Sequence, residues 1–231
     1  MTGAGRATRM MTESVWLQTP VPIYLEVGSK KVFACSVHWP GWCRAAKTEE
    51  AAIQGITEYA TRYAPVARKA KIKFFDEPPT DFKVVERLKG SATTDFGAPG
   101  AIAEGDKKKL SEAEAKRTAD LLRAGWRVLD LVVAKAPPEL RKGPRGGGRD
   151  RDGVFRHVLT AETGYARALG IKMPEPDFGD TRAINRLRSA IYDDIASARP
   201  PGSKGWPPRF AARRMAWHVL DHAWEIEDKS S

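Results

Sequence analysis

The amino-acid sequence predicts an α+β protein of two domains, in which a small α/β domain precedes a four-helix bundle. Two observations indicate this fold class. Short alternating apolar runs dominate residues 15–92, whereas apolar residues recur at helical spacing throughout residues 110–231. The intervening residues 93–109 are rich in Gly, Pro and charge, which is typical of a linker. Residues 1–14 show neither pattern, and we expect them to form a flexible tail.

A β-hairpin is expected at the start of the α/β domain. Residues 21–28 alternate apolar and polar side chains, and residues 30–39 continue as a second strand after a tight Gly28–Ser29 turn. Alternation of this kind is typical of strands that bury one face.

One helix and two further strands are expected after the hairpin. Thr48 caps the helix and is followed by two glutamates, which the helix dipole favours in the first turn. We expect Pro65 to end this helix, because proline lacks the N–H that continues the hydrogen-bond ladder. Residues 71–78 and 81–88 then read as two more strands.

The first two helices of the bundle have recognisable ends. Ser111 and Glu114 form a capping box, and a double proline closes that helix after residue 136. Asp152 is the expected cap of the second helix, and Gly170 is expected to stop it. The core face of the first helix is marked at helical spacing by Leu122, Trp126, Leu129 and Val133.

The third and fourth helices complete the bundle. Asp180 or Thr181 starts the third, and the fourth runs from about Phe210 to about Asp228. One face of the third helix carries Ile184, Leu187, Ile191 and Ile195. Four amphipathic helices of this length, joined by such loops, predict a four-helix bundle.

The composition excludes several classes of protein. Hydrophobic residues make up 42% of the chain, which supports a packed core, and no apolar run approaches the roughly 20 residues that span a bilayer. The N-terminus lacks the apolar stretch of a secretory signal. Two cysteines, Cys35 and Cys43, match neither a CxxC motif nor a disulfide framework, so we expect reduced thiols and a cytoplasmic protein.

Charge and aromatic residues offer further candidate sites. The net charge of +10 favours anionic partners, and its densest run is RKGPRGGGRDR at residues 141–151. This run could bind nucleic acid or capture an anion, although a solvated loop is the favoured interpretation. Cys43 could be a reactive thiol, and Trp39 and Trp42 could stack a ligand, but burial in the core is favoured for all three.

Three of the four histidines fall on two helical faces that are expected to point into the bundle. His218 and His222 are four residues apart on the last helix, so their side chains are neighbours, and His157 lies on the second helix. Three imidazoles buried without partners would each cost roughly 1–3 kcal/mol, a cost that a divalent ion removes. Three ligands with one open position are typical of catalytic zinc. The alternative is three structural core histidines.

Two carboxylates accompany the histidines of the last helix. Glu225 follows His222 by three residues and could be a further ligand or an acceptor for an imidazole N–H. Asp221 could orient His218 in the same way or face solvent.

The helix that carries His157 offers space as well as a ligand. His157 shares one seam with Val154, Ala161, Gly164 and Ala168. Residues as small as Ala161 and Gly164 cannot fill a bundle core, so we expect room for a pocket beside His157.

Residues 110–228 resemble the DinB/YfiT-like superfamily of metal-binding four-helix bundles. The matching residues are His157 in FRHVLTAETGYAR and the pair His218 and His222 in AWHVLDHAWEIED. The resemblance implies a divalent metal, zinc or nickel, held by this histidine triad. It also implies a thiol-dependent transferase or isomerase, in which a low-molecular-weight thiol such as mycothiol attacks a small electrophilic substrate.

Two other functions stay open alongside this enzyme. The protein could be a regulatory or binding protein in which the metal only stabilises the bundle, or a basic nucleic-acid-binding protein that uses residues 141–151. An enzyme should leave the triad accessible, whereas a structural site should be closed by a fourth protein ligand, with Glu225 the candidate.

Residues 38–60 resemble a HicB-like antitoxin domain. The matching features are a turn containing Pro40, Gly41 and Cys43, and a helix that opens at Thr48 with two glutamates and two alanines. The resemblance implies a small α/β fold, and we expect this domain to be a recognition or dimerisation module.

Overall fold

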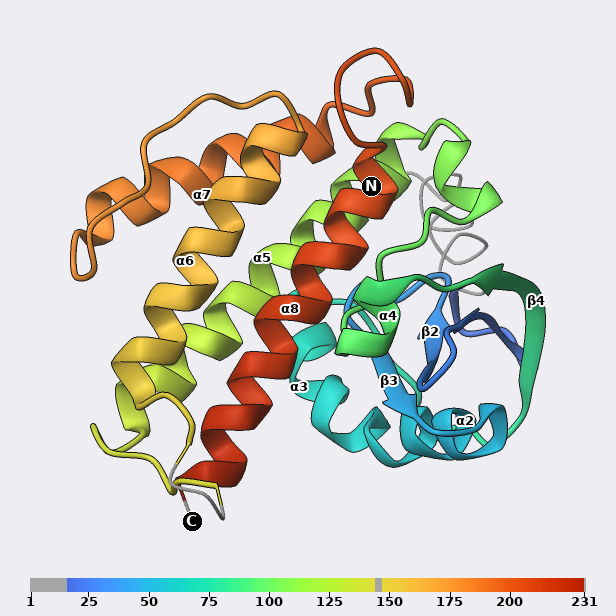
Figure 1. The fold of residues 1–231 in the computed structure, drawn as a ribbon. Coiled ribbons are helices and arrows are strands. Elements are labelled where there is room, and N and C mark those ends of the chain that lie inside the picture. Colours follow the sequence, from blue (N-terminus) through green and yellow to red (C-terminus); the bar gives the residue numbers. More distant parts are fainter. Residues whose placement is uncertain (1–15, 144–146, 231) are drawn as a thin grey trace. The chain divides into compact units, whose positions relative to one another are not determined.

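The computed structural model describes residues 16–143 and 147–230, which form a four-stranded sheet and the helices α2 to α8 (Figure 1). The predicted mixed α+β class is therefore confirmed. The chain divides into two compact units, Met1–Ala101 and Ile102–Ser231, and each is described by itself. The predicted tail over residues 1–14 lies outside the described residues.

The first unit is built on the sheet, whose strand order is β3-β2-β1-β4. Strands β1 and β2 pair antiparallel, with Val27 opposite Val32, so the predicted hairpin is confirmed. β4 returns to pair parallel with β1. The strands are β1 (Val21–Val27), β2 (Val32–Ser36), β3 (Cys43–Ala46) and β4 (Phe82–Lys89).

Both faces of β1 are buried, although its alternating pattern is typical of a strand with one face in solvent. Glu26 can be wholly buried because hydrogen bonds satisfy both oxygens of its carboxylate. One oxygen accepts hydrogen bonds from the Thr94 hydroxyl at 2.5 Å and the Gly100 N–H at 2.9 Å, and the other accepts from the Ala101 N–H at 2.9 Å. Thr94 lies in α4 (Ala92–Phe96), a short helix within the stretch predicted as linker.

The predicted helix after Thr48 is interrupted earlier than expected. Thr48 caps α2 (Glu49–Glu58) as predicted, but the break comes at Tyr59, and α3 (Ala60–Lys69) contains Pro65 in its interior. The prediction that Pro65 ends the helix was wrong. A proline removes only its own N–H from the ladder, and the rest of α3 is held by buried Tyr63, Val66 and Ala67.

Residues 71–78 do not form the predicted strand. Phe74 is instead buried in an aromatic cluster with Trp39, Trp42 and Tyr63. The Trp42 indole N–H donates to the Ile56 carbonyl at 2.8 Å, and the Tyr63 hydroxyl donates to the Pro40 carbonyl at 2.9 Å. Trp39 and Trp42 are therefore core residues, as favoured above.

Cys35 and Cys43 are not the reduced thiols that the sequence predicted. They lie opposite each other on β2 and β3, with Cα atoms 4.1 Å apart, and are joined by a disulfide. Cys43 is thus neither free nor exposed. The spacing gave no hint of this pairing, because the turn between the strands decides which residues face each other.

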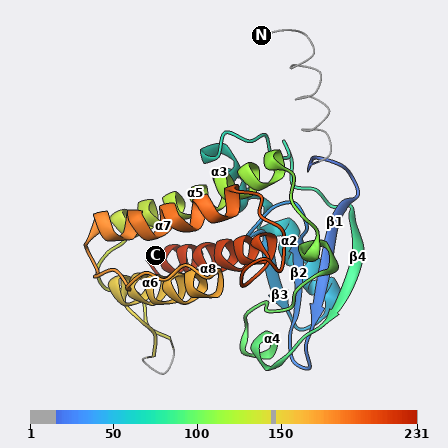
Figure 2. The same cartoon turned by 90° about the horizontal axis from the view of Figure 1, so that it is seen from above.

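The second unit contains the four long helices, which pack against one another as a bundle. Figure 2 shows α5 and α7 on one side of α8 and α6 on the other, and α8 contacts both α5 and α6. The helices are α5 (Glu112–Lys135), α6 (Arg151–Ala168), α7 (Thr181–Ala196) and α8 (Pro208–Lys229). Within the described residues, no helix is both long and apolar enough to cross a bilayer.

The bundle helices begin and end largely where their capping residues predict. Ser111 and Glu114 form the predicted capping box of α5, and Asp180 caps α7 through the Ala183 N–H. Gly170 follows α6 with φ +81°, a conformation that glycine adopts readily. The N-cap of α6 is Asp150 rather than the predicted Asp152, which lies in the first turn and pairs with Arg151.

Candidate metal centre

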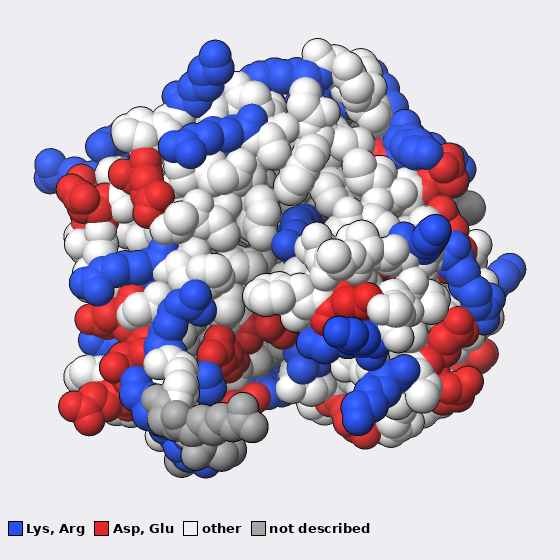
Figure 3. All heavy atoms as spheres, viewed as in Figure 1, with Lys and Arg blue, Asp and Glu red and all other residues white. Residues whose placement is uncertain are grey.

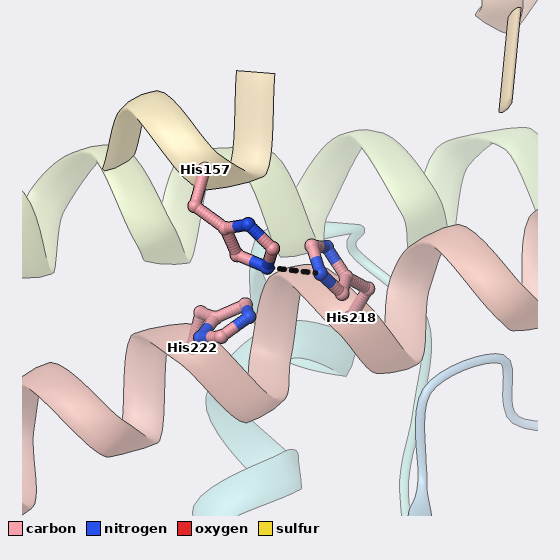
Figure 4. Close-up of side chains that lie close together, drawn as sticks. All are labelled: His157, His218 and His222. Atoms are coloured by element: carbon pink, nitrogen blue, oxygen red, sulfur yellow. Dashed lines mark hydrogen bonds between the residues drawn. The ribbon is translucent and has the colours of Figure 1, made fainter. Parts of the chain in front are cut away.

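Helices α6 and α8 bring the three predicted histidines together. Figure 4 shows His157 of α6 facing His218 and His222 of α8. The Nε2 atoms of His157 and His218 are 3.2 Å apart, and the centroids of the three rings lie 4.5–5.1 Å from one another. One ring nitrogen from each residue lies within 4.8 Å of the other two, so the three side chains could hold one metal ion.

The second nitrogen of His222 is held by Glu225. Glu225 Oε2 lies 2.7 Å from His222 Nδ1, and its Oε1 accepts from Lys229 Nζ at 2.5 Å. The bond from His222, together with Lys229, lowers the pKa of Glu225 to about 2. A carboxylate at Nδ1 fixes the proton there and leaves Nε2 as the free lone pair, as is common for metal-binding histidines.

Glu225 does not close the site as a fourth ligand. Both of its oxygens are engaged on the far side of His222, and it is not part of the cluster of ligand atoms. Asp221 does not orient His218 either, because Nδ1 of that ring has no hydrogen-bond partner among the described residues.

Burial favours the neutral form of His218 and His157. His218 is only 6% exposed, and burial, with the nearby histidines and two arginines, lowers its pKa to about 2. Burial also lowers the pKa of His157, with further contributions from His222 and Arg149. Neutral imidazoles keep their lone pairs, which is the protonation state a metal ion requires.

The donor set fits a divalent ion. A neutral imidazole has one N–H, so a single hydrogen bond satisfies the close Nε2 pair of His157 and His218, while His218 Nδ1 stays unpaired in the core. Figure 4 shows the free nitrogen of His222 directed at the same point. One cation could satisfy all three of these nitrogens together, with the proton of each imidazole on its other nitrogen.

The α6 side of the site is open. His157 and Ala161 are half-buried and Gly164 is exposed, and a Cβ placed on Gly164 would meet nothing within 4 Å. The prediction that this seam faces the core is therefore confirmed for buried Val154 and was wrong for exposed Gly164. Beyond Val154, the helix buries a neighbouring face, turned toward α7 and α8, which carries Phe155, Val158, Leu159 and Ala166.

The sequence did not indicate that Arg214, Tyr165 and Arg149 lie beside the triad. The Arg214 guanidinium lies over the rings of Tyr165 and Trp217, at 5.6 and 4.9 Å, and both rings contact His218. Arg149 lies at the end of the basic loop, just before α6. Its side chain lies against Gly153, one helical turn before His157. The position of Arg214, four residues before His218, is the signal that could have identified it.

A second polar cluster lies elsewhere in the bundle and was also missed. Arg188 of α7 donates to both oxygens of Glu162 on α6, at 3.1 and 3.4 Å. It donates also to both oxygens of Asp130 on α5, at 2.8 and 3.1 Å. This cluster joins three helices and uses every oxygen of its two carboxylates.

The basic run does not form a uniform positive surface. Arg141 donates to the Asp228 carbonyl, Lys142 pairs with Asp150, and Arg145 lies outside the described residues. On the face drawn in Figure 3, Lys and Arg lie interspersed with Asp and Glu. A continuous basic patch, which is the usual footprint of nucleic-acid binding, is not seen on that face.

Comparison with known proteins leaves this geometry as the main guide. No protein-family model, no curated protein and no solved structure matches the chain. Within residues 16–143 and 147–230, the histidine triad is the one cluster of three or more His, Cys, Asp or Glu side chains with metal-binding geometry.

Proposed function

We propose that the second unit is a DinB-like divalent-metal protein that uses the metal to activate a small thiol for transfer to, or isomerisation of, an electrophilic substrate. The observation that carries this proposal is the convergence of three histidine nitrogens on one point, with no fourth protein ligand among the described residues. The resemblance of residues 110–228 to that superfamily supports the same function.

The residues of the chain have separate parts in this proposal. His157, His218 and His222 would hold the ion, and Glu225 keeps the proton of His222 on Nδ1 so that Nε2 can bind. Burial of His218 keeps water from competing on the core side. A divalent ion held there, zinc or nickel, would lower the pKa of a coordinated thiol, which produces a nucleophile at neutral pH.

The open α6 side favours a catalytic over a purely structural metal. Structural zinc sites are closed by four protein ligands, whereas catalytic sites keep one position for water or substrate. Here both oxygens of the candidate fourth ligand, Glu225, are used by His222 and Lys229. Exposed Gly164 leaves space on the face of α6 that carries His157.

Metal analysis tests the proposal directly. The full chain, purified without a polyhistidine tag, should contain close to one equivalent of divalent metal by mass spectrometry. The double variant His218→Ala, His222→Ala should contain none, and a His38→Ala variant, which changes the one histidine outside the triad, should keep it. Absence of metal from the wild type after zinc and nickel are added back would overturn the proposal.

A further inference from the structure

We propose that Arg214, with the Tyr165 hydroxyl, binds an acidic group of the small molecule that enters the metal site, so that the ligand is an anion such as a carboxylate-bearing thiol. This inference rests on the proposed metal site and specifies the chemical class of its ligand. Three features of the described residues carry it: the unpaired guanidinium, the charge around the triad and the free tyrosine hydroxyl.

The Arg214 guanidinium has no anionic partner. It makes no ion pair or hydrogen bond with the described residues, and its Nη1 atom is buried without a partner. Among the described residues, the Arg214 guanidinium instead makes cation–π contacts with the faces of Tyr165 and Trp217. Its Nε and Nη2 atoms are not among the buried unpartnered atoms, so this edge of the guanidinium can donate two parallel hydrogen bonds to a planar anion.

The two fully buried arginines of the bundle are paired. Arg188 is neutralised by Glu162 and Asp130, and Arg213, the neighbour of Arg214 on α8, is neutralised by Asp106. Arg214 is half-buried, so its charge is partly removed from water, and a chain that pairs Arg188 and Arg213 but not Arg214 leaves Arg214 available to a ligand.

The charge around the triad is positive before any metal enters. Arg214 lies over two rings that contact His218, Arg149 lies one helical turn before His157, and the nearby carboxylate, Glu225, is already paired with Lys229. A divalent ion would add two further positive charges. An anionic ligand balances this excess, whereas a neutral or cationic ligand does not.

The Tyr165 hydroxyl is the second donor. Tyr165 stacks edge-on against His218 and lies under Arg214, yet its hydroxyl has no hydrogen-bond partner among the described residues. It lies on α6 between exposed Gly164 and buried Ala166, at the border of the open seam. One guanidinium and one hydroxyl beside the same histidine make a compact site for one acidic group.

A matched pair of thiols tests the inference on the zinc-loaded full chain. Calorimetric titration would compare 3-mercaptopropionate with 3-mercaptopropanol, which have the same three-carbon chain and thiol but differ in charge. The acid should bind the wild type about tenfold more tightly or better, because hydrogen bonds to charged groups contribute that much. Raising the salt concentration should reduce the preference.

Substitutions of Arg214 then locate the acidic group. Arg214→Gln should remove the preference while zinc content and the affinity for 3-mercaptopropanol stay unchanged. Arg214→Lys should keep part of the preference, because an ammonium supplies charge without the planar fork. Arg186→Gln removes an exposed arginine of α7 and the same amount of charge, and it should leave the preference intact.

The outcomes separate this inference from the proposed function. A protein that holds zinc but prefers neither thiol, or an Arg214→Gln variant that keeps the full preference, overturns the anion site and leaves the metal site standing. A protein that holds no zinc overturns both. Loss of the preference in Arg214→Gln alone, with zinc retained, supports the assignment.

Discussion

Two polar clusters lie inside the same bundle, and they differ in how completely they satisfy themselves. The Arg188 cluster uses both oxygens of Glu162 and of Asp130, and Glu162 is 1% exposed. In the histidine cluster, Nδ1 of His218 has no partner, and three ring nitrogens converge on one point. Both clusters connect α6 to other helices, so location alone does not distinguish them.

The two clusters therefore have different expected roles, one in stability and the other in ligand binding. An ionic cluster in which every carboxylate oxygen accepts a hydrogen bond can specify how helices align, but it has no unpaired group to bind a ligand. A cluster with free lone pairs and a neighbouring unpaired guanidinium is costly unless something else completes it. The comparison predicts that damage to the first cluster affects stability, whereas damage to the second affects ligand binding.

The largest effect is expected from Arg188→Ala. Removal of the guanidinium leaves Glu162 buried without a partner, which should lower the free energy of unfolding by about 3–5 kcal/mol. Urea unfolding followed by circular dichroism measures the change. Arg186→Ala, an exposed position two residues earlier on α7, should stay within about 0.5 kcal/mol of the wild type. A loss for Arg188→Ala no larger than that of the control would show that the cluster does not hold the helices together.

Glu225→Ala should weaken the metal site without unfolding the protein. The carboxylate holds the proton of His222 on Nδ1, so its removal should lower zinc affinity by about 10–100-fold. Competition with a coloured chelator measures the affinity. Glu225→Gln keeps a hydrogen-bond acceptor and should lose less. Equal affinity in the wild type and in Glu225→Ala would contradict the role of Glu225.

The metal-free protein should lose stability as the pH falls from about 6.5 to 5. Burial lowers the pKa of His218 from 6.5 to about 2, so in this window the unfolded chain takes up a proton that the folded chain does not. The slope should reach about 1.4 kcal/mol per pH unit, and the lowered pKa of His157 acts in the same direction. Glu225 contributes only below its ordinary value of 4.5, outside the window.

Unfolding of the metal-free chain at several pH values measures this slope. A His218→Phe variant removes the buried imidazole and should flatten the slope between pH 5 and 6.5. A wild type whose stability is constant over that range would mean that His218 becomes protonated in the folded state.

The smallest effect concerns the open seam. Gly164→Ala should raise stability by about 0.5–1 kcal/mol, because glycine is unfavourable inside a helix and the added methyl group meets nothing within 4 Å. Thermal unfolding measures the gain. A loss of stability would mean that the seam is packed, and the access argued for the metal site would then fail.

Local patterns predicted the helices and the pair His218 and His222 because both depend on spacing along one element. The helical period placed the core residues of α7, from Ile184 to Ile195, and the four-residue step placed His218 beside His222. His157 was found because it lies on another amphipathic helix of the same bundle.

The remaining features depend on contacts between elements, which the period of one element does not indicate. Arg188 and Asp130 are 58 positions apart, so no local pattern indicates that they pair. The disulfide between Cys35 and Cys43 depends on the turn that aligns β2 with β3. The period of α6 was read correctly, but which of its faces is buried depends on where α7 and α8 lie.

The three proposed ligands come from two helices, α6 and α8, so metal binding depends on the packing of these helices against each other. His218 and His222 belong to one helix, so an isolated α8 would already present two ligands, whereas the third, 61 positions from His218, arrives only when α6 docks. Metal affinity therefore measures the docking of α6 on α8. By thermodynamic linkage, the free energy by which a bound ion stabilises the docked helices equals the free energy of binding that the ion loses when they separate.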